Sequence, residues 1–179
     1  QYAHYFPFIP SNLSRGILAK YLKAFCNRSN CVVVPTDPVK QLLLKEGVTK
    51  LIEVVPTGVN IDEADSFSGA GIRVKYNIPN DSILLVYVGR LGKEKNIEFL
   101  YKAFRIILDR GKNAYLMVVA GGPLEKHLKE SARAMGIDQR VIFTGQIDYP
   151  KVFDYYKASD IFVFASKSET QGLVIAEAE

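Results

Sequence analysis

The stretch SILLVYVGRLGKEKNIEFLYKAFRIILDRGKNAYLMVVAGGP, residues 82–123, decides the fold of this chain. It opens with the apolar run Ile83–Val88, which is typical of a strand buried on both faces of a parallel sheet. Apolar side chains then recur at helical spacing between Asn96, the expected N-cap, and Gly111, the expected end of a helix. A second apolar strand, at 115–120, completes a strand–helix–strand unit.

The same alternation continues to the last residue of the chain. We expect, in order, a helix from Pro123 to Gly136, a strand at 141–144, a helix at 149–158, a strand at 161–165 and the beginning of a helix at 172–179. Short strands joined by helices form a parallel sheet, because right-handed crossovers place the helices on both of its faces. We therefore predict an α/β fold with a Rossmann-like doubly wound parallel sheet, whose four strands take the spatial order 3-2-1-4.

The first 55 residues have a different pattern. An apolar stripe predicts an amphipathic helix with its apolar side toward the protein, and it consists of Ile17, Leu18, Tyr21, Leu22 and Phe25. Strands are expected at 31–34 and 51–55, with a helix between them that Asp37 caps and Gly47 ends. These elements form a short βαβ unit.

A turn-rich joint, PTGVN at residues 56–60, follows this βαβ unit. Clusters of proline, glycine and asparagine mark connections between structural elements. We therefore place a domain boundary at this joint, with residues 1–57 in one domain and residues 58–179 in the other.

The net charge of +4 lies in the first third of the chain. Residues 1–55 carry seven of the 23 basic side chains and three of the 19 acidic ones, so the remainder is balanced. Before Asp37 there are four basic and six aromatic residues but no acid, which indicates a local anionic partner rather than general nucleic-acid binding. We expect reversible contact with an anionic membrane through the segment from Tyr2 to Arg28.

Composition excludes several classes of protein. Hydrophobic residues make up 48% of the chain and charged residues 23%, which disfavours disorder. No apolar run approaches the ~18 residues of a membrane-spanning helix, and no secretory leader opens the chain, so we expect a cytoplasmic location. Cys26 and Cys31 are too few for a zinc site or a disulfide scaffold, and we expect both to be reduced and buried. His4 and His127 are lone histidines and predict no metal site.

A first candidate site stands at the carboxyl end of the first strand of the long unit. The glycine fingerprints of dehydrogenases and P-loop ATPases are absent, and Gly89-Arg90 stands there instead, with Lys95 five residues further on. Ligands of open α/β sheets bind at these strand ends, and two cations suit a diphosphate. The alternative is that both cations are solvated loop charges.

A second candidate site lies in the last eleven residues. Glu169 precedes Glu177 by eight positions, and Gly172 stands between them at the expected helix start. Two carboxylates offer acceptors for hydroxyl groups, while the unpaired amides at a helix start suit an anion. The alternative is an ordinary helix start with two surface glutamates.

Together, these two constellations resemble the retaining glycosyltransferases of family 4 (glycosyl transferases group 1), which have the GT-B fold. Further matching stretches run in family order toward the end of the chain: Val55-Pro56-Thr57-Gly58-Val59, Ala120-Gly121-Gly122-Pro123, Phe143-Thr144-Gly145 and Ala158-Ser159-Asp160. A narrower resemblance, to the diacylglycerol glucosyltransferases, rests on Tyr2-Ala3-His4-Tyr5-Phe6-Pro7, Cys26-Asn27-Arg28, Pro35-Thr36 and Glu169-Thr170-Gln171-Gly172-Leu173.

The resemblance implies transfer of a sugar from a nucleotide-sugar to an acceptor with retained configuration. The narrower resemblance favours UDP-glucose as the donor and diacylglycerol or another membrane lipid as the acceptor. No metal or other cofactor is expected. Arg90 and Lys95 would hold the diphosphate, Glu169 the sugar and Glu177 the ribose; the first three are the expected catalytic residues. The expected donor-binding residues, with Gly122 and Ile147 near the base, are Gly89, Arg90, Lys95, Gly122, Ile147, Glu169, Gln171, Gly172, Leu173, Val174 and Glu177.

A GT-B enzyme has two α/β domains with the reaction in the cleft between them. By this resemblance, residues 1–57 are the C-terminal end of the acceptor-side domain, and residues 58–179 are the nucleotide-sugar-binding domain, cut short at its C-terminal end. We therefore expect the chain alone to be inactive. A non-catalytic nucleotide- or anion-binding module stays open as an alternative, as does a polysaccharide or phosphoinositol acceptor within the enzyme class.

Overall fold

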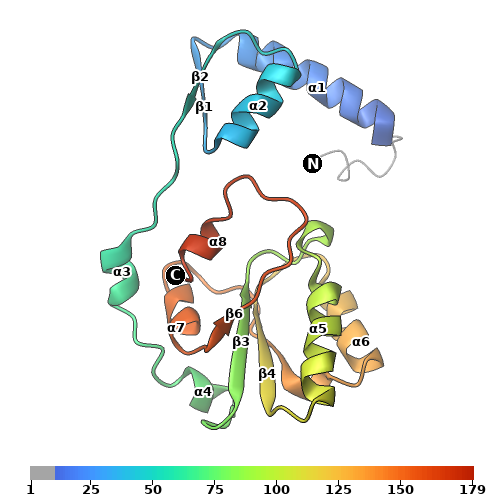
Figure 1. Ribbon diagram of the computed structural model, residues 1–179, viewed down its shortest axis with the longest axis vertical. Helices are drawn as coiled ribbons and strands as arrows, with labels where there is room; N and C mark the ends of the chain where they lie inside the picture. The colour runs from blue at the N-terminus through green and yellow to red at the C-terminus, as the bar shows by residue number, and fades with distance from the viewer. Residues whose placement is uncertain (1–10) are drawn as a thin grey trace. The chain divides into compact units, whose positions relative to one another are not determined.

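The computed structural model describes the backbone of residues 11–179 and the side chains of residues 16–179. The chain divides into two compact units (Figure 1). One consists of Gln1–Gly58 with Glu169–Gly172, and the other of Val59–Ser168 with Leu173–Glu179. The segment that carries Glu169 thus belongs to the first unit.

The first unit contains a two-stranded parallel sheet. Its elements are α1 (Ser11–Asn27), β1 (Cys31–Val34), α2 (Asp37–Lys45) and β2 (Leu51–Val54). Cys31 pairs with Leu51, and the register continues residue by residue to Val34 and Val54. A small core holds the sheet and both helices together, and its buried members are Cys26, Val34, Leu43, Val48 and Ile52.

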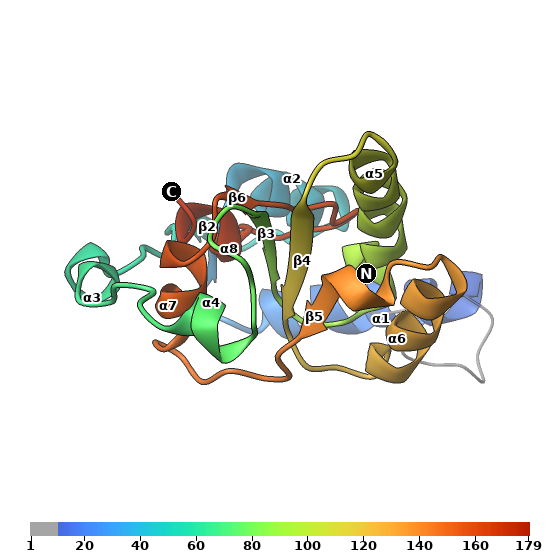
Figure 2. The ribbon, with the colours of Figure 1, turned by 90° about the horizontal axis from the view of Figure 1, so that it is seen from below.

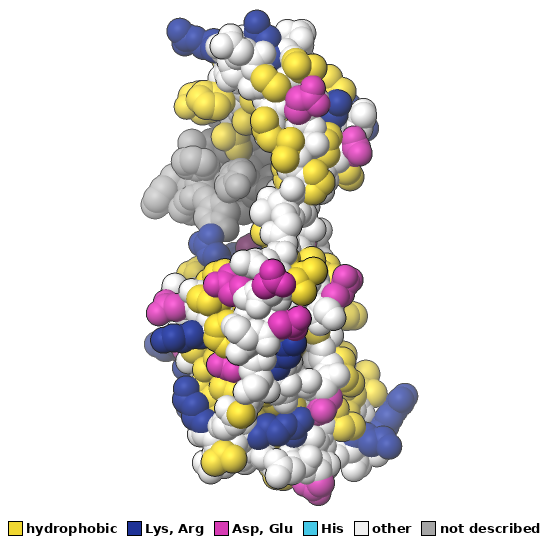
Figure 3. Space-filling view, turned by 90° about the vertical axis from the view of Figure 1, so that its left-hand side faces the viewer, with side chains coloured by type: hydrophobic (Ala, Val, Ile, Leu, Met, Phe, Trp, Pro, Cys, Tyr) yellow, Lys and Arg dark blue, Asp and Glu magenta, His cyan; other side chains and the backbone are white. Residues whose placement is uncertain are grey.

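The prediction that the apolar stripe of α1 faces the protein is wrong. Ile17 is 56% exposed, Tyr21 67% and Phe25 62%. Among the described side chains of α1, Cys26 near its end is the buried one, and the Asn27 side chain accepts a hydrogen bond from the Thr49 N–H (2.8 Å). Figure 3 shows hydrophobic side chains on another part of the surface of the first unit, interspersed with charged ones.

Two smaller expectations for the first unit are also wrong. Cys31 is exposed because it occupies the first position of β1, where the chain enters the sheet, and both cysteines are free thiols. Thr36, not Asp37, is the N-cap of α2, since its backbone is still extended; Asp37 and Pro38 already lie in the first turn.

The second unit is built around a four-stranded parallel sheet. Its elements are α3 (Ile61–Asp65), α4 (Ile72–Lys75), β3 (Ile83–Val88), α5 (Ile97–Asp109), β4 (Ala114–Val119), α6 (Glu125–Ala134), β5 (Val141–Phe143), α7 (Val152–Lys157), β6 (Ile161–Phe162) and α8 (Leu173–Ala176). Its strands follow the order β5-β4-β3-β6. The predicted order 3-2-1-4 and the α/β fold class are therefore confirmed.

Helices cover both faces of this sheet, with α5 and α6 on one face and α4 and α7 on the other (Figures 1 and 2). Successive strand residues point to opposite faces. Leu85 and Tyr87 of β3 accordingly pack with α5 and α6, whereas Leu84, Val86 and Val88 pack with α4 and α7. The continuous apolar run of β3 thus serves two cores.

Several predicted boundaries shift in the second unit. Asn96 precedes α5 with a left-handed backbone (φ 57°) and makes no side-chain capping bond, so its predicted capping role is wrong. The helix expected from Pro123 begins at Glu125, and the helix expected from residue 149 begins at Val152. The expected terminal helix is a single turn, α8. The residues before α6 and before α7 belong to loops that follow strands of the sheet.

An ion pair fastens the start of β3 to α4 and to the start of β6. The Asp160 carboxylate accepts hydrogen bonds from the Arg73 guanidinium (2.7 Å) and from the backbone N–H of Leu84 (2.7 Å). Arg73 also donates to the carbonyls of Ala158, Pro79 and Ser82. Leu84 is fully buried, so in the intact fold its N–H is satisfied by the Asp160 carboxylate rather than by water.

Asp160→Ala is expected to destabilise the second unit by about 1–3 kcal/mol, because the Leu84 N–H loses its acceptor and the Arg73 guanidinium loses its ion pair. Asp109→Ala is the matched control, since Asp109 pairs with Arg105 (2.9 Å) on the exposed side of α5. It should cost no more than about 0.5 kcal/mol. Urea unfolding followed by circular dichroism measures both, and equal small losses would contradict the stated role of Asp160.

Candidate functional site

The loops that follow β3 and β4 continue the pairing of the two strands. The Gly89 N–H donates to the Val119 carbonyl (3.3 Å), and the Leu91 N–H donates to the Gly121 carbonyl (3.1 Å). The Leu124 N–H then donates back to the Leu91 carbonyl (3.4 Å). The two loops are therefore one hydrogen-bonded platform at the carboxyl end of the sheet.

Gly122 is what allows this close approach. A Cβ atom at this position would lie 2.8 Å from the Leu91 nitrogen and 2.9 Å from the Leu91 oxygen, closer than real Cβ atoms come. The atoms in the way are backbone, which cannot rotate aside. Gly122 therefore has a structural role in joining the two loops.

The Tyr87 side chain holds the first of these two loops by a hydrogen bond. Its ring is fully buried under the loop, and its hydroxyl donates to the Arg90 carbonyl (3.1 Å). A Cβ atom on Gly89 would lie 3.0 Å from that hydroxyl. Sequence reasoning missed Tyr87, although a single tyrosine in an aliphatic strand, two residues before a glycine, is a signal that could have found it.

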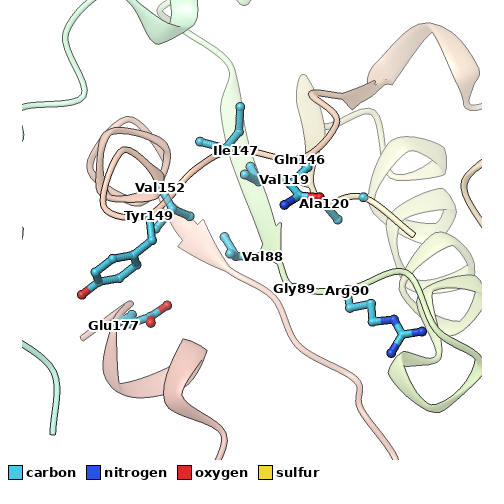
Figure 4. Close-up of a pocket in the computed structure, with 11 residues that line it drawn as sticks. Val88, Gly89, Arg90, Val119, Ala120, Gln146, Ile147, Tyr149, Val152 and Glu177 are labelled. Atoms are coloured by element: carbon cyan, nitrogen blue, oxygen red, sulfur yellow. The ribbon is translucent and has the colours of Figure 1, made fainter. Parts of the chain in front are cut away.

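A pocket of about 410 Å³ opens beside this platform (Figure 4). The ends of β3 and β4, the loop after β5, the start of α7 and the residue after α8 all contribute to it. Its lining consists of Val88, Gly89, Arg90, Val119, Ala120, Gly121, Gln146, Ile147, Tyr149, Val152 and Glu177. In Figure 4 Tyr149 and Glu177 lie on one side of the pocket and Arg90 on the other.

The Glu177 carboxylate is held in place on its side of the pocket. The residue directly follows α8, and its N–H donates to the Leu173 carbonyl (2.9 Å). Its Oε2 atom accepts a hydrogen bond from the Tyr156 hydroxyl (3.0 Å). Partial burial and the carboxylates of Glu63 and Glu177 raise the pKa of Tyr149, which therefore stays a neutral phenol beside this carboxylate.

Lys95 lies in the same unit but outside the pocket lining. It ends a 3-10 turn, Lys93–Lys95, and its ammonium group lies 5.8 Å from the centroid of the Phe164 ring. The Glu94 carbonyl accepts a hydrogen bond from the Lys167 N–H (2.8 Å). The turn is thereby fixed to the segment after β6.

The structure brings together part of the predicted site. Gly89, Arg90, Ile147 and Glu177 line the pocket. Gly121, the neighbour of the predicted Gly122, also lines the pocket. Other predicted residues of the second unit lie outside the lining, namely Lys95, Gly122, Leu173 and Val174. Glu169, Gln171 and Gly172 belong to the first unit.

The Gln171 side chain has a partner within the first unit. Its carboxamide oxygen accepts from the Thr57 N–H (3.2 Å), and its amide group donates to the Thr57 carbonyl. The neighbouring Thr170 carbonyl accepts a hydrogen bond from the Thr36 hydroxyl (3.0 Å). The roles predicted for Glu169 and Gln171 in sugar binding stay predictions.

Two features of the described residues concern cofactors and membranes. Within residues 11–179, side chains of His, Cys, Asp and Glu form no group of three or more with the geometry to hold a metal ion. His127, one of the two histidines, pairs with Glu98 at the surface (3.0 Å). No helix in the same part of the chain is both long enough and apolar enough to cross a bilayer.

Comparison with protein families agrees with the resemblance in the sequence. Residues 70–179 match the family model described as Glycosyl transferases group 1. Residues 1–63 match the model described as Glycosyltransferase Family 4. The predicted family is therefore confirmed.

Two relatives carry the same name. Alpha-monoglucosyldiacylglycerol synthase of Streptococcus pneumoniae is 34% identical over 184 residues, which cover 99% of this chain and 42% of that protein. The synthase of that name from Acholeplasma laidlawii is 25% identical over 99% of this chain and 47% of its own length. The chain thus spans less than half the length of these relatives.

Solved structures show the same fold. Sucrose-phosphate synthase from Thermosynechococcus elongatus superimposes with a TM-score of 0.78 at 26% identity, over 98% of this chain and 45% of that chain. HepE from Anabaena, solved in complex with UDP and glucose, superimposes with a TM-score of 0.78 at 18% identity, over 89% and 45% of the two chains. At 18% identity, the similarity to HepE shows a shared fold and nothing more.

Gly122→Ala is expected to separate the two loops, because the new methyl group meets the Leu91 backbone. The amide protons of Leu91 and Leu124 should then exchange at least about tenfold faster, which corresponds to about 1.4 kcal/mol of local stability. Hydrogen exchange followed by NMR measures this. Gly58→Ala is the control, since a Cβ there meets nothing within 4 Å and its φ lies outside the left-handed region. Unchanged exchange in Gly122→Ala would show that the close approach is dispensable.

Proposed function

The chain belongs to the family of group 1 glycosyl transferases, and on that basis we propose that the protein transfers a sugar from a nucleotide-sugar to an acceptor with retention of configuration. The observation that carries the proposal is the pocket at the carboxyl ends of β3 and β4, with a cation at one side and a carboxylate at the other. This is the crevice in which open α/β sheets bind nucleotides. Because the chain spans less than half of its relatives, the activity is proposed for the protein as a whole.

The donor diphosphate is proposed to bind at the platform formed by the two loops. The Arg90 guanidinium offers hydrogen-bond donors there, and Lys95 adds a second cation. Negative charge grows on the diphosphate as its bond to the sugar breaks, so fixed donors stabilise the transition state more than the ground state. Such donors can assist departure of the diphosphate without a metal ion.

The ribose and base are proposed to occupy the other side of the pocket. A carboxylate accepts hydrogen bonds from two neighbouring hydroxyl groups, which suits Glu177 to the ribose. Ile147 and Gly121 offer an apolar edge and open backbone for the base. Glu169, with the backbone from Gln171 to Val174, is proposed to bind the sugar.

We propose a membrane lipid, diacylglycerol in the first instance, as the acceptor and UDP-glucose as the donor. The support is the name shared by the two relatives and the subgroup motifs around Glu169. The exposed side chains of α1 add a surface argument. Lys20, Lys23 and Arg28 are exposed on or next to the same helix as the apolar stripe. Such a helix suits peripheral contact with the anionic inner face of a membrane.

A non-catalytic nucleotide-binding module is the competing function. Both functions require nucleotide binding, but only the enzyme releases a nucleoside diphosphate in the presence of an acceptor. Incubation of the full-length protein with UDP-glucose and diacylglycerol vesicles, followed by analysis of UDP and glycolipid, distinguishes them. Nucleotide binding without release of UDP would favour the module.

Glu177→Ala is expected to weaken binding of a nucleoside diphosphate roughly 10–150-fold, because charge-assisted hydrogen bonds to the ribose contribute about 1.5–3 kcal/mol. Glu177→Gln should weaken it less, since the amide oxygen still accepts a hydrogen bond. Calorimetry against UDP, GDP and ADP provides the dissociation constants. If affinity for a 2′,3′-dideoxy nucleotide falls by the same factor as for the ribonucleotide, Glu177 does not recognise the ribose.

Lys20→Glu with Lys23→Glu is expected to reduce binding to phosphatidylglycerol vesicles at low salt. Each cation near an anionic surface contributes about 1 kcal/mol, so a two-charge reversal removes at least ~2 kcal/mol, roughly 30-fold. Vesicle co-sedimentation measures the effect, with phosphatidylcholine vesicles as the control. Equal binding of the unaltered protein to neutral and anionic vesicles would contradict an electrostatic contact.

A further inference from the structure

Two neighbouring tyrosines of α7 point in different directions. The Tyr155 side chain is buried, and its hydroxyl lies 3.4 Å from the hydroxyl of Tyr76. The Tyr156 hydroxyl instead lies 3.0 Å from Glu177 Oε2 and 3.3 Å from the Val174 carbonyl oxygen. Of the two, only Tyr156 therefore touches the carboxylate that lines the pocket.

The backbone around Glu177 belongs to a short turn. α8 is a single turn without a buried residue, and Val174 is its side chain that packs against the core. Glu177 follows directly, attached to α8 through one backbone hydrogen bond. The Tyr156 hydroxyl reaches both α8 and the Glu177 carboxylate, so it ties this turn to α7.

We propose that Tyr156 is a positioning residue for ribose recognition: its hydroxyl fixes the Glu177 carboxylate in the orientation in which it meets the two ribose hydroxyls. The inference rests on the proposed function and names a residue that acts through Glu177 without touching the ligand. A carboxylate has about four acceptor positions. One bond from Tyr156 to Oε2 therefore leaves acceptors for two hydroxyls.

The Tyr156 ring is itself fixed by other aromatic side chains. Phe162 of β6 meets it edge-on at a centroid distance of 5.8 Å, and the ring of Phe153 lies tilted at 6.1 Å. Phe162 in turn stacks on Phe164 at 5.9 Å, and the Lys95 ammonium lies over Phe164. Aromatic pairs of this kind favour one relative geometry. The same row thus supports Glu177 at one end and Lys95 at the other.

The Tyr156 hydroxyl also keeps its proton. Burial raises the pKa of Tyr156, and the charge of Glu177 together with the hydrogen bond to it raises the pKa further. The phenol therefore remains a hydrogen-bond donor to the carboxylate throughout the physiological range.

The test compares Tyr156→Phe with Tyr155→Phe, which removes a hydroxyl from the same helix without a contact to Glu177. The probes are UDP, GDP or ADP, whichever binds the full-length protein, and its 2′,3′-dideoxy analogue, measured by calorimetry. Tyr156→Phe should weaken binding of the ribonucleotide about 3–10-fold, a fraction of what complete loss of the carboxylate contact costs. Binding of the dideoxy analogue should change less than about twofold. Tyr155→Phe should alter neither.

Turnover provides a second readout. A ribose contact is present equally in the ground state and the transition state, so Tyr156→Phe should raise the donor KM and leave kcat nearly unchanged. In the Glu177→Ala background, Tyr156→Phe should cause no further loss of affinity. If Tyr156 had a merely structural role, Tyr156→Phe would lower kcat, and in the Glu177→Ala background it would weaken nucleotide binding further.

The outcomes separate the two proposals. If Glu177→Ala abolishes the preference for ribose but Tyr156→Phe retains it, the positioning role is overturned and the proposed function stands. Equal losses for the ribonucleotide and the dideoxy analogue in Tyr156→Phe also overturn the positioning role. If no nucleoside diphosphate binds the unaltered protein, or Glu177→Ala changes nothing, the proposed donor site fails and the role of Tyr156 fails with it.

Discussion

The parallel pairing of β3 with β4 is the constraint on which the second unit depends. Six residue pairs run in register from Ile83 and Ala114 to Val88 and Val119. The pairing does not stop where the strands end, because the Leu91 N–H bonds the Gly121 carbonyl in the loops beyond. Both loops are therefore set at fixed positions by the sheet, and the pocket forms beside them.

This arrangement explains why polar side chains support the pocket from inside the fold. Tyr87 holds the Arg90 carbonyl from the α5 side of the sheet, and Tyr156 holds Glu177 from α7. Each hydroxyl has an acceptor at the edge of the pocket, so burial of the ring does not leave a polar group unpaired. The two sides of the pocket thus have independent anchors, one in β3 and one in α7.

The sequence predicts the sheet well because its strands are continuous apolar runs and its helices have regular spacing. Strand order follows from the right-handed crossovers. Gly89, Arg90 and Glu177 belong to local motifs and line the pocket together with Ile147, and their roles in donor binding stay predictions. The sequence analysis did not single out Tyr149 and Tyr156, because the contacts of each with the region of Glu177 depend on the packing of distant residues. No local pattern contains that information.

Other expectations fail because they depend on packing. The apolar stripe of α1 is regular, yet periodicity says only that one side is apolar and not what covers it, and in the first unit the stripe is exposed. The place of Gly122 near the base stays a prediction, and its approach to Leu91 adds a structural role that the sequence analysis did not expect. That contact joins two loops that are far apart in sequence, so motif reasoning could not distinguish the two roles.

A crystal structure of the protein with a bound nucleoside diphosphate tests the central claim most directly. The account predicts the diphosphate beside Gly89 and Arg90, and both ribose hydroxyls within hydrogen-bond distance of the Glu177 carboxylate, with the Tyr156 hydroxyl still on Oε2. A nucleotide bound outside this pocket, or bound in it with the ribose away from Glu177, would contradict the account.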